Sequence, residues 1–164
     1  MRNIKTIFIL VLSLILLLAV SCSNEDKTGG ETETIEEIDA KDFPTELLGE
    51  YRDDILYDMY GPNDCTKVST IMEKGIQKTK IEGTWLLIKD DGTKSGQKHW
   101  PSIEKWKKTT KGGKIIKLEG EYYSKPNGGK YTIIYDYASE TLSCTFASDS
   151  GKKYLFNGKK QPTE

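Results

Sequence analysis

The residues of this chain that could do chemistry are few, and they do not form a catalytic set. His99 is the only histidine, so a histidine-based metal cluster is excluded and a Ser-His-Asp triad would depend on this one side chain. Its neighbours Lys98 and Trp100 favour a place on the surface or in a loop. The carboxylates of Asp53-Asp54 and of Asp90-Asp91 would point to opposite faces of a strand, so neither pair can act as one acid–base couple. We therefore expect no enzyme activity, no metal site and no cofactor.

One of the three cysteines follows a pattern that indicates export. Arg2 and Lys5 precede the apolar run Ile7–Val20, which is typical of a secretory signal and shorter than the ~20 residues of a membrane-spanning helix. The segment Ala19-Val20-Ser21-Cys22 then resembles the lipobox of bacterial lipoproteins. This resemblance implies that residues 1–21 are a signal peptide and that Cys22 carries the lipid that holds the chain at a membrane. An ordinary signal peptide or an uncleaved anchor is the alternative.

The other two cysteines, Cys65 and Cys144, form an even pair in an oxidising compartment. A disulfide between them would close a loop of about 80 residues and stabilise the fold by about 4–5 kcal/mol in the chain-entropy model. The alternative is a buried free thiol at Cys144, which lies on the apolar face of its expected strand.

Charge is unevenly distributed along the chain, although its formal net charge is only −1. Residues 24–58 contain 13 acidic and 3 basic residues, whereas residues 94–160 contain 6 acidic and 14 basic ones. The small net charge argues against a nucleic-acid partner. The lysines either leave a basic end free to meet anions or fill solvent-facing strand positions.

The segment from Cys22 to Asp42 predicts a flexible acidic tether, because it contains too few apolar residues to fold. Its first residues, Ser23-Asn24-Glu25-Asp26, resemble the acidic segment that sends some bacterial lipoproteins to the outer membrane or the cell surface. We therefore expect an exported protein, anchored to a membrane by its N-terminal lipid.

Residues 43–160 predict an all-β domain, an antiparallel meander that closes into a small barrel, followed by a short tail at 161–164. Strand-like runs recur between turn signals every eight to twelve residues. The candidate strands are 49–52, 55–60, 66–72, 76–81, 84–89, 114–123, 130–137, 141–147 and 153–157. The last four form a meander, in which Leu142, Cys144 and Phe146 share one face. Residues 97–113 are the least regular, and we expect them to form a loop that closes one end of the barrel.

Two segments resemble signatures of the lipocalin-type (calycin) family. Phe43-Pro44 leading to Leu48-Gly49-Glu50-Tyr51 resembles the opening Gly-x-Trp motif, with Tyr51 in the Trp position. Tyr135-Asp136-Tyr137 resembles the Thr-Asp-Tyr motif late in the barrel. No arginine follows Arg52 in the chain, so the closing arginine of the family's third motif is missing. The resemblance implies a lipocalin-like barrel with an apolar interior for a small hydrophobic ligand.

A second resemblance concerns the segment from Ser148 to Tyr154. It is similar to the Ser-Gly-x-x-Tyr segment of lipoprotein inhibitors of c-type lysozyme, which insert a serine and a downstream lysine into the lysozyme cleft. Ser150 and Lys159 would carry those roles here. The alternative interpretation of the same residues is an ordinary hairpin turn.

The aromatic residues are candidates for ligand binding. They could line a cavity or stack on a sugar, or they could form the core; Trp100 and Trp106 are the strongest ligand candidates because they lie in the irregular segment. The candidate set is Trp85, Trp100, Trp106, Tyr131 and Tyr135. We expect non-catalytic binding of a small apolar or sugar-like ligand in the barrel mouth. Binding of a protein, such as a c-type lysozyme, is the alternative.

Overall fold

Eleven antiparallel strands form one sheet in residues 32–162, the part of the chain that the computed structural model describes. The strands are β1 (Glu33–Asp39), β2 (Gly49–Arg52), β3 (Thr66–Glu73), β4 (Ile76–Ile88), β5 (Lys94–His99), β6 (Ser102–Ile103), β7 (Lys105–Lys111), β8 (Lys114–Ser124), β9 (Gly129–Asp136), β10 (Thr141–Ser148) and β11 (Lys153–Lys160). Hydrogen-bonded neighbours follow the order β1-β7-β8-β9-β10-β11-β2-β3-β4-β5, and β6 pairs with β4. The predicted all-β antiparallel class is confirmed.

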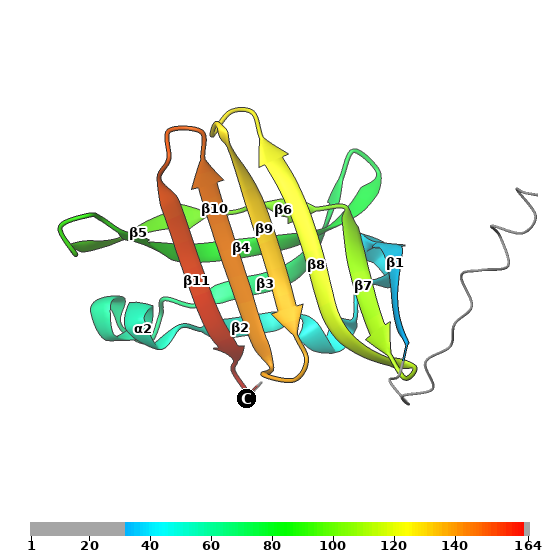
Figure 1. Cartoon of the computed structure of the whole chain (residues 1–164). Coiled ribbons are helices and arrows are strands. Elements are labelled where there is room, and N and C mark those ends of the chain that lie inside the picture. The colour runs from blue at the N-terminus through cyan, green and yellow to red at the C-terminus, as the bar shows by residue number, and fades with distance from the viewer. Residues whose placement is uncertain (1–31, 163–164) are drawn as a thin grey trace, which may run out of the picture. The chain divides into compact units, whose positions relative to one another are not determined.

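The sheet bends over itself into two layers. Strands β7 to β11 form the front layer in Figure 1, and β2 to β6 cross behind them at a steep angle. Strand β11 belongs to both layers: Lys159 and Lys160 pair with β2, whereas Tyr154 and Leu155 pair with β4. The apolar face of each layer is therefore turned toward the other, and the core lies between them.

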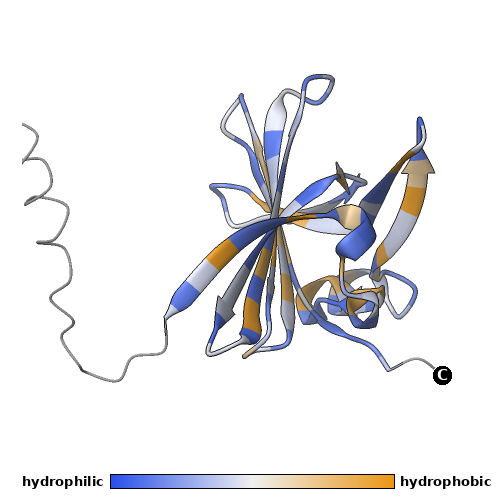
Figure 2. Ribbon diagram, turned by 90° about the vertical axis from the view of Figure 1, so that its right-hand side faces the viewer, coloured by the Kyte–Doolittle hydropathy of each residue, from blue (hydrophilic) through white to orange (hydrophobic). Residues whose placement is uncertain are grey.

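The front layer contains the four-stranded C-terminal meander that the sequence predicts. Strands β8 to β11 pair in an unbroken antiparallel series, and buried residues alternate with more exposed ones along β9, β10 and β11. Figure 2 shows the molecule from the side, with hydrophobic and hydrophilic bands following one another along the strands. Leu142, Cys144 and Phe146 are buried on one face of β10, as the alternation predicts. This meander is confirmed.

Two segments outside the meander differ from the prediction. Strand β4 is one strand of 13 residues, where the sequence predicts two. The strand continues through Gly83, where β3 lies very close. A Cβ at this position would be 2.6 Å from the Cα of Thr66, so only a glycine permits this approach of the two strands. The segment 97–113 is not a closing loop, since β5 ends within it and it also contains β6 and β7.

The strand predicted at 55–60 is wrong, because Asp54–Tyr60 form the helix α2. Asp53 caps this helix: its Oδ1 accepts hydrogen bonds from the backbone N–H groups of Ile55, at 2.9 Å, and Leu56, at 3.2 Å. Its Oδ2 accepts a third from the N–H of Asn157 in β11, at 2.9 Å. A contact with the far end of the chain thus fixes the start of the helix. Two 3₁₀ helices, η1 (Ala40–Asp42) and η2 (Thr45–Leu47), precede β2.

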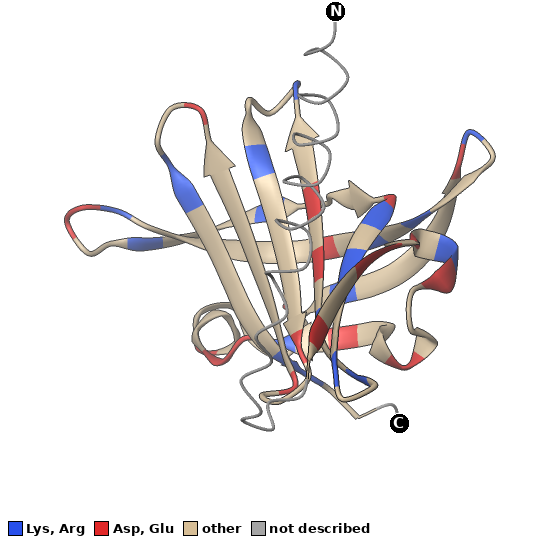
Figure 3. Ribbon diagram, turned by 45° about the vertical axis from the view of Figure 1, so that its right-hand side comes forward, with Lys and Arg blue, Asp and Glu red and all other residues tan. Residues whose placement is uncertain are grey.

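The tether predicted over 22–42 is wrong in its second half, because Glu33–Asp39 form β1 and pair with β7 along their whole length. The carboxylates of β1 lie beside the lysines of β7 (Figure 3). Lys105 Nζ is 3.2 Å from Glu37 and 2.8 Å from Asp39, and Lys108 pairs with Glu36. A partner strand rich in lysine therefore orders an acidic segment that its own composition would leave unfolded.

The signal peptide and the lipid-attachment residue Cys22 lie outside the described residues, as do 163–164. Within residues 32–162, no helix is both long enough and apolar enough to cross a membrane.

Candidate functional site

The five aromatic ligand candidates divide between the core and the surface. Trp85 and Trp106 are 0% and 1% exposed, and Tyr135 is also buried, so these three are core residues. Trp106 packs against Phe43, with ring centroids 4.8 Å apart. Trp100 is different, because 59% of it is exposed. The prediction of ligand binding is therefore wrong for Trp85, Trp106 and Tyr135, and the alternative of core residues holds for them. Trp100 borders both cavities, as does Tyr131, which is 3% exposed.

Two adjacent cavities are lined by residues of the β8–β9 and β10–β11 turns and of the segment from the end of β5 to β6. The two turns are at the top of Figure 1. The first has a volume of about 190 Å³ and the second about 400 Å³. Both are lined by Trp100, Asn127 and Tyr131. We call the two cavities with these three shared residues the rim site.

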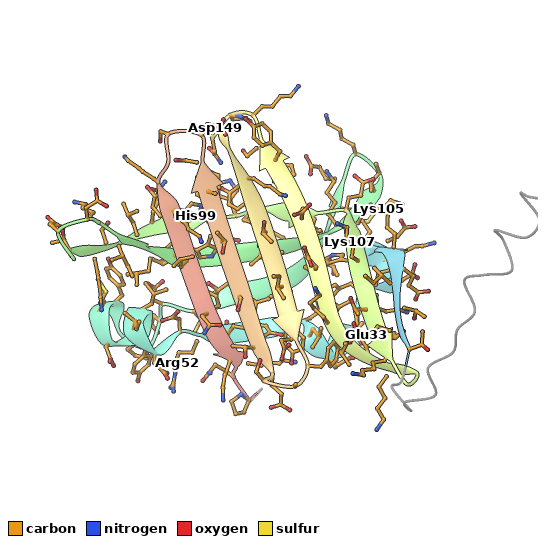
Figure 4. The ribbon with its side chains drawn as sticks, in the orientation of Figure 1. Glu33, Arg52, His99, Lys105, Lys107 and Asp149 are labelled. Carbon is orange, nitrogen blue, oxygen red and sulfur yellow. The ribbon has the colours of Figure 1, made fainter. Side chains whose placement is uncertain are left out.

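Hydrogen bonds between the two turns hold the front wall of the rim site. The backbone N–H of Asp149 donates to the carbonyl of Gly128 at 2.7 Å. The hydroxyl of Tyr123 donates a hydrogen bond to the Asp149 carboxylate at 2.6 Å. This hydrogen bond raises the pKa of Tyr123. Asp149 lies at the top of the front layer in Figure 4. Its two hydrogen bonds connect the β10–β11 turn to the β8–β9 turn. A wall that is braced before a ligand arrives loses less entropy on binding.

His99 borders the first cavity from inside the protein. It is 3% exposed, so the prediction of a surface or loop residue is wrong. Its ring stacks on Trp85, with centroids 4.7 Å apart, and the rings of Tyr154 and Phe146 lie at 4.9 and 5.2 Å. Burial among these rings lowers the pKa of His99 to about 4. The imidazole is therefore neutral at pH 7.

A short hydrogen-bond chain connects His99 to the turn that lines both cavities. Asn127 Nδ2 donates to the Tyr131 hydroxyl at 3.3 Å, and that hydroxyl lies 3.1 Å from Nδ1 of His99. If the hydroxyl donates to Nδ1, the imidazole proton is on Nε2, which has no hydrogen-bond partner among the described residues. This chain fixes the orientation of Tyr131 and Asn127 toward the rim site.

The first cavity is polar and basic on its outer side. Ser148 Oγ lies 2.9 Å from Ser150 Oγ and accepts a hydrogen bond from the backbone N–H of Lys152 at 3.0 Å. Lys98 and Lys152 both line this cavity, and none of its lining residues is an aspartate or a glutamate. The second cavity contains Glu73 and Lys78, which form an ion pair at 3.1 Å. Hydroxyls, an amide and ammonium groups therefore surround an exposed indole.

The two residues of the lysozyme-inhibitor resemblance lie far apart. Ser150 is in the β10–β11 turn and lines the first cavity. Lys159 is near the far end of β11, opposite Arg52 in the backbone pairing of β11 with β2. At about 3.3 Å per strand residue, the length of β11 separates them by more than about 20 Å. They do not converge on one site.

The cysteine pair is not bonded: Cys65 and Cys144 are both free. Cys144 is 1% exposed in the core, and its burial raises the pKa of its thiol. Of the two alternatives for these residues, the structure contains the buried free thiol.

Two further cavities lie elsewhere, and polar contacts within the protein occupy much of their lining. One, of about 390 Å³ beside α2, contains Asp64, which is bonded to Thr84 at 2.7 Å and paired with Lys98 at 3.1 Å. The other, of about 470 Å³ near the β3–β4 turn, is bordered by the ion pair of Lys105 and Asp39. No group of three or more metal-ligating side chains occurs in residues 32–162.

Sequence reasoning identified Trp100 and Tyr131 but missed the residues that complete the site around them. Asn127 belongs to a Pro-Asn-Gly-Gly segment, which reads only as a turn. His99 and Lys98 belong to a strand, β5, that shows little alternation of apolar and polar residues. Only the crossing of the two layers brings these segments together. No family model, curated protein or solved structure matches this chain.

Proposed function

We propose that this chain is an exported, membrane-anchored lipoprotein of the bacterial envelope whose β domain binds a small sugar-like ligand at the rim site, without catalysis. One observation carries the ligand proposal: two cavities share an exposed indole, Trp100, and a tyrosine and an amide oriented beside it. Sugars offer one apolar ring face and many hydroxyls, and a site of one aromatic plane with several polar groups matches both.

The mixed lining of the rim site favours a sugar over a wholly apolar ligand. The space between the layers is filled by buried side chains that include Trp85, Trp106 and Tyr51, so the apolar interior site implied by the lipocalin resemblance lacks support. Lysozyme inhibition would need Ser150 and Lys159 side by side, and it is the weaker candidate for that reason.

A lipocalin-like barrel, partly closed, is the architecture that we propose within the antiparallel class. Two observations support it. Tyr51 and Tyr135, from the two segments that resemble the family, pack edge to face with centroids 6.3 Å apart. Strand β11 pairs with both β2 and β4, which brings the rear strands back to the front layer.

The anchoring proposal depends on Cys22 and has a direct test. The full chain, expressed in a bacterium that processes lipoproteins, is expected to incorporate labelled palmitate and to fractionate with the outer membrane. The Cys22→Ser variant should lose the label and leave the membrane fraction, because a serine offers no thiol for acylation and no acyl chains hold it there. Equal fractionation of both chains would contradict the anchor.

The binding proposal predicts that Trp100→Ala weakens ligand binding by about 30-fold, since truncating a tryptophan at the centre of a binding site typically costs about 2 kcal/mol or more. The measurement is calorimetric titration of the full chain in detergent with a galacturonate trimer and with a hyaluronan tetrasaccharide. Ile88→Ala is the matched control, because Ile88 is also exposed and lines neither cavity. Equal affinities for the Trp100→Ala variant and the parent would refute the role of Trp100.

A further inference from the structure

Resting on the proposed function, we infer that the ligand of the rim site is an acidic oligosaccharide of at least two sugar units, which crosses Trp100 and places a carboxylate or sulfate group beside Lys152. The inference has two parts, the length of the ligand and its charge. Each depends on a different observation.

The length follows from the sizes of the two cavities and from the three residues that line both. The first cavity, at about 190 Å³, is smaller than the roughly 300–1,000 Å³ of most small-molecule sites. The second, at about 400 Å³, shares Trp100, Asn127 and Tyr131 with the first, and the two volumes taken together fall within that range. A chain of linked rings fills both cavities with Trp100 beneath the linkage, whereas a single compact ring leaves one of them empty.

The middle of this path is oriented before binding. Tyr122 stacks on Tyr131, with centroids 6.0 Å apart, and lines the second cavity. Asn127 is hydrogen-bonded to the Tyr131 hydroxyl, which leaves its amide oxygen available to a sugar hydroxyl. Since Tyr131 is itself held by His99, Tyr131 and Asn127 form a fixed platform that borders both cavities beside Trp100.

The charge of the ligand follows from the ammonium groups of the first cavity. Lys98 already has a carboxylate partner, Asp64, at 3.1 Å. Lys152 has no carboxylate within ion-pair distance among residues 32–162. The carboxylate nearest to it in sequence, that of Asp149 three residues earlier, accepts a hydrogen bond from the hydroxyl of Tyr123 at 2.6 Å and does not line the cavity. An anionic group on the ligand would be the missing partner of Lys152.

The second cavity carries no such excess charge, because Glu73 and Lys78 neutralise each other at 3.1 Å. The positive potential is therefore confined to one end of the path. This asymmetry fixes the direction of the chain, with its acidic unit in the first cavity and a neutral or weakly charged unit in the second.

The test compares each acidic probe with its uncharged methyl ester. Galacturonate trimer and hyaluronan tetrasaccharide, in the acid and the ester form, are titrated into the full chain in detergent. The acid forms should bind about tenfold more tightly than the esters, as expected for one charge-assisted hydrogen bond. Raising the salt from 50 to 500 mM should weaken only the acid forms.

Two lysine variants provide the matched pair. Lys152→Met removes the ammonium and keeps an unbranched stem, and it should reduce the preference for the acid to less than about threefold. Lys153→Met is the control, because Lys153 is the next residue and lines neither cavity; it should keep the full preference. Equal binding of acid and ester by the parent, or an undiminished preference in Lys152→Met, would overturn the acidic assignment and leave the sugar site standing. Absence of binding by all four probes would overturn both.

Discussion

Trp106→Ala is expected to lower the free energy of unfolding by about 3–5 kcal/mol, as truncation of a buried tryptophan generally does. The indole is 1% exposed and packs on Phe43. Its Nε1 donates a hydrogen bond to the Oγ1 of Thr79, which is itself buried, at 3.2 Å. Truncation leaves both a cavity and an unpartnered hydroxyl in the core. Urea denaturation followed by far-UV circular dichroism measures the loss.

The matched control for this prediction is Trp100→Ala. Because Trp100 is 59% exposed, its removal should change the free energy of unfolding by less than about 0.5 kcal/mol, while it abolishes most of the ligand binding. The two tryptophans thus separate stability from recognition. If both variants lost similar stability, Trp100 would belong to the core and the rim site would lose its central residue.

Lowering the pH from 7 to 5 is expected to reduce the free energy of unfolding by about 2 kcal/mol through His99 alone, and a further decrease to pH 4 by about 1 kcal/mol more. In the unfolded chain the imidazole takes up its proton near pH 6.5, whereas in the folded protein its pKa is about 4. The unfolded state therefore binds more protons throughout this interval. The stability contributed by the neutral His99 is complete above about pH 6.5, is lost progressively as the pH falls from 6.5 to 4, and changes little below pH 4.

This interval separates His99 from the carboxylates. Hydrogen bonds from Lys105 and Lys130 lower the pKa values of Asp39 and Glu121, so the stability that these groups contribute is lost only below about pH 4.5. His99→Phe preserves a ring against Trp85 and cannot titrate, so its stability should be nearly constant between pH 7 and 5. An NMR titration of the His99 ring gives a second measurement. A pKa near 6.5 in the folded protein would contradict the prediction.

The C-terminal half of the fold was predictable because its information is local. Alternation of apolar and polar residues identified β8 to β11, and turn signals between these runs, such as the Pro-Asn-Gly-Gly segment that contains Asn127, separated the strands. The helix α2 was missed although its signals are present: Asp53 is a capping residue, and Gly61 ends the helix with a φ of +86°. The apolar residues of 55–60 outweighed these signals because a short apolar run does not distinguish a strand from a helix.

The parts that the sequence could not reveal depend on contacts between distant segments. Strand β1 exists because the lysines of β7, some 70 residues later in the chain, neutralise its carboxylates. His99 is buried because β5 crosses behind β10 and β11 and places its ring among three aromatic side chains from other strands. The rim site combines residues from β5 and two turns of the front layer. Pairwise chemistry of this kind leaves no trace in the spacing of residues along one segment.

The docking of β1 also determines how far the domain can travel from its attachment point. The first strand begins at Glu33, so ten residues separate it from Cys22. A segment of this length spans at most about 40 Å when fully extended. A body of this size is itself about 35–40 Å across. If Cys22 carries the lipid, the domain therefore stays within about one diameter of the bilayer, and only molecules in that thin layer come within its reach.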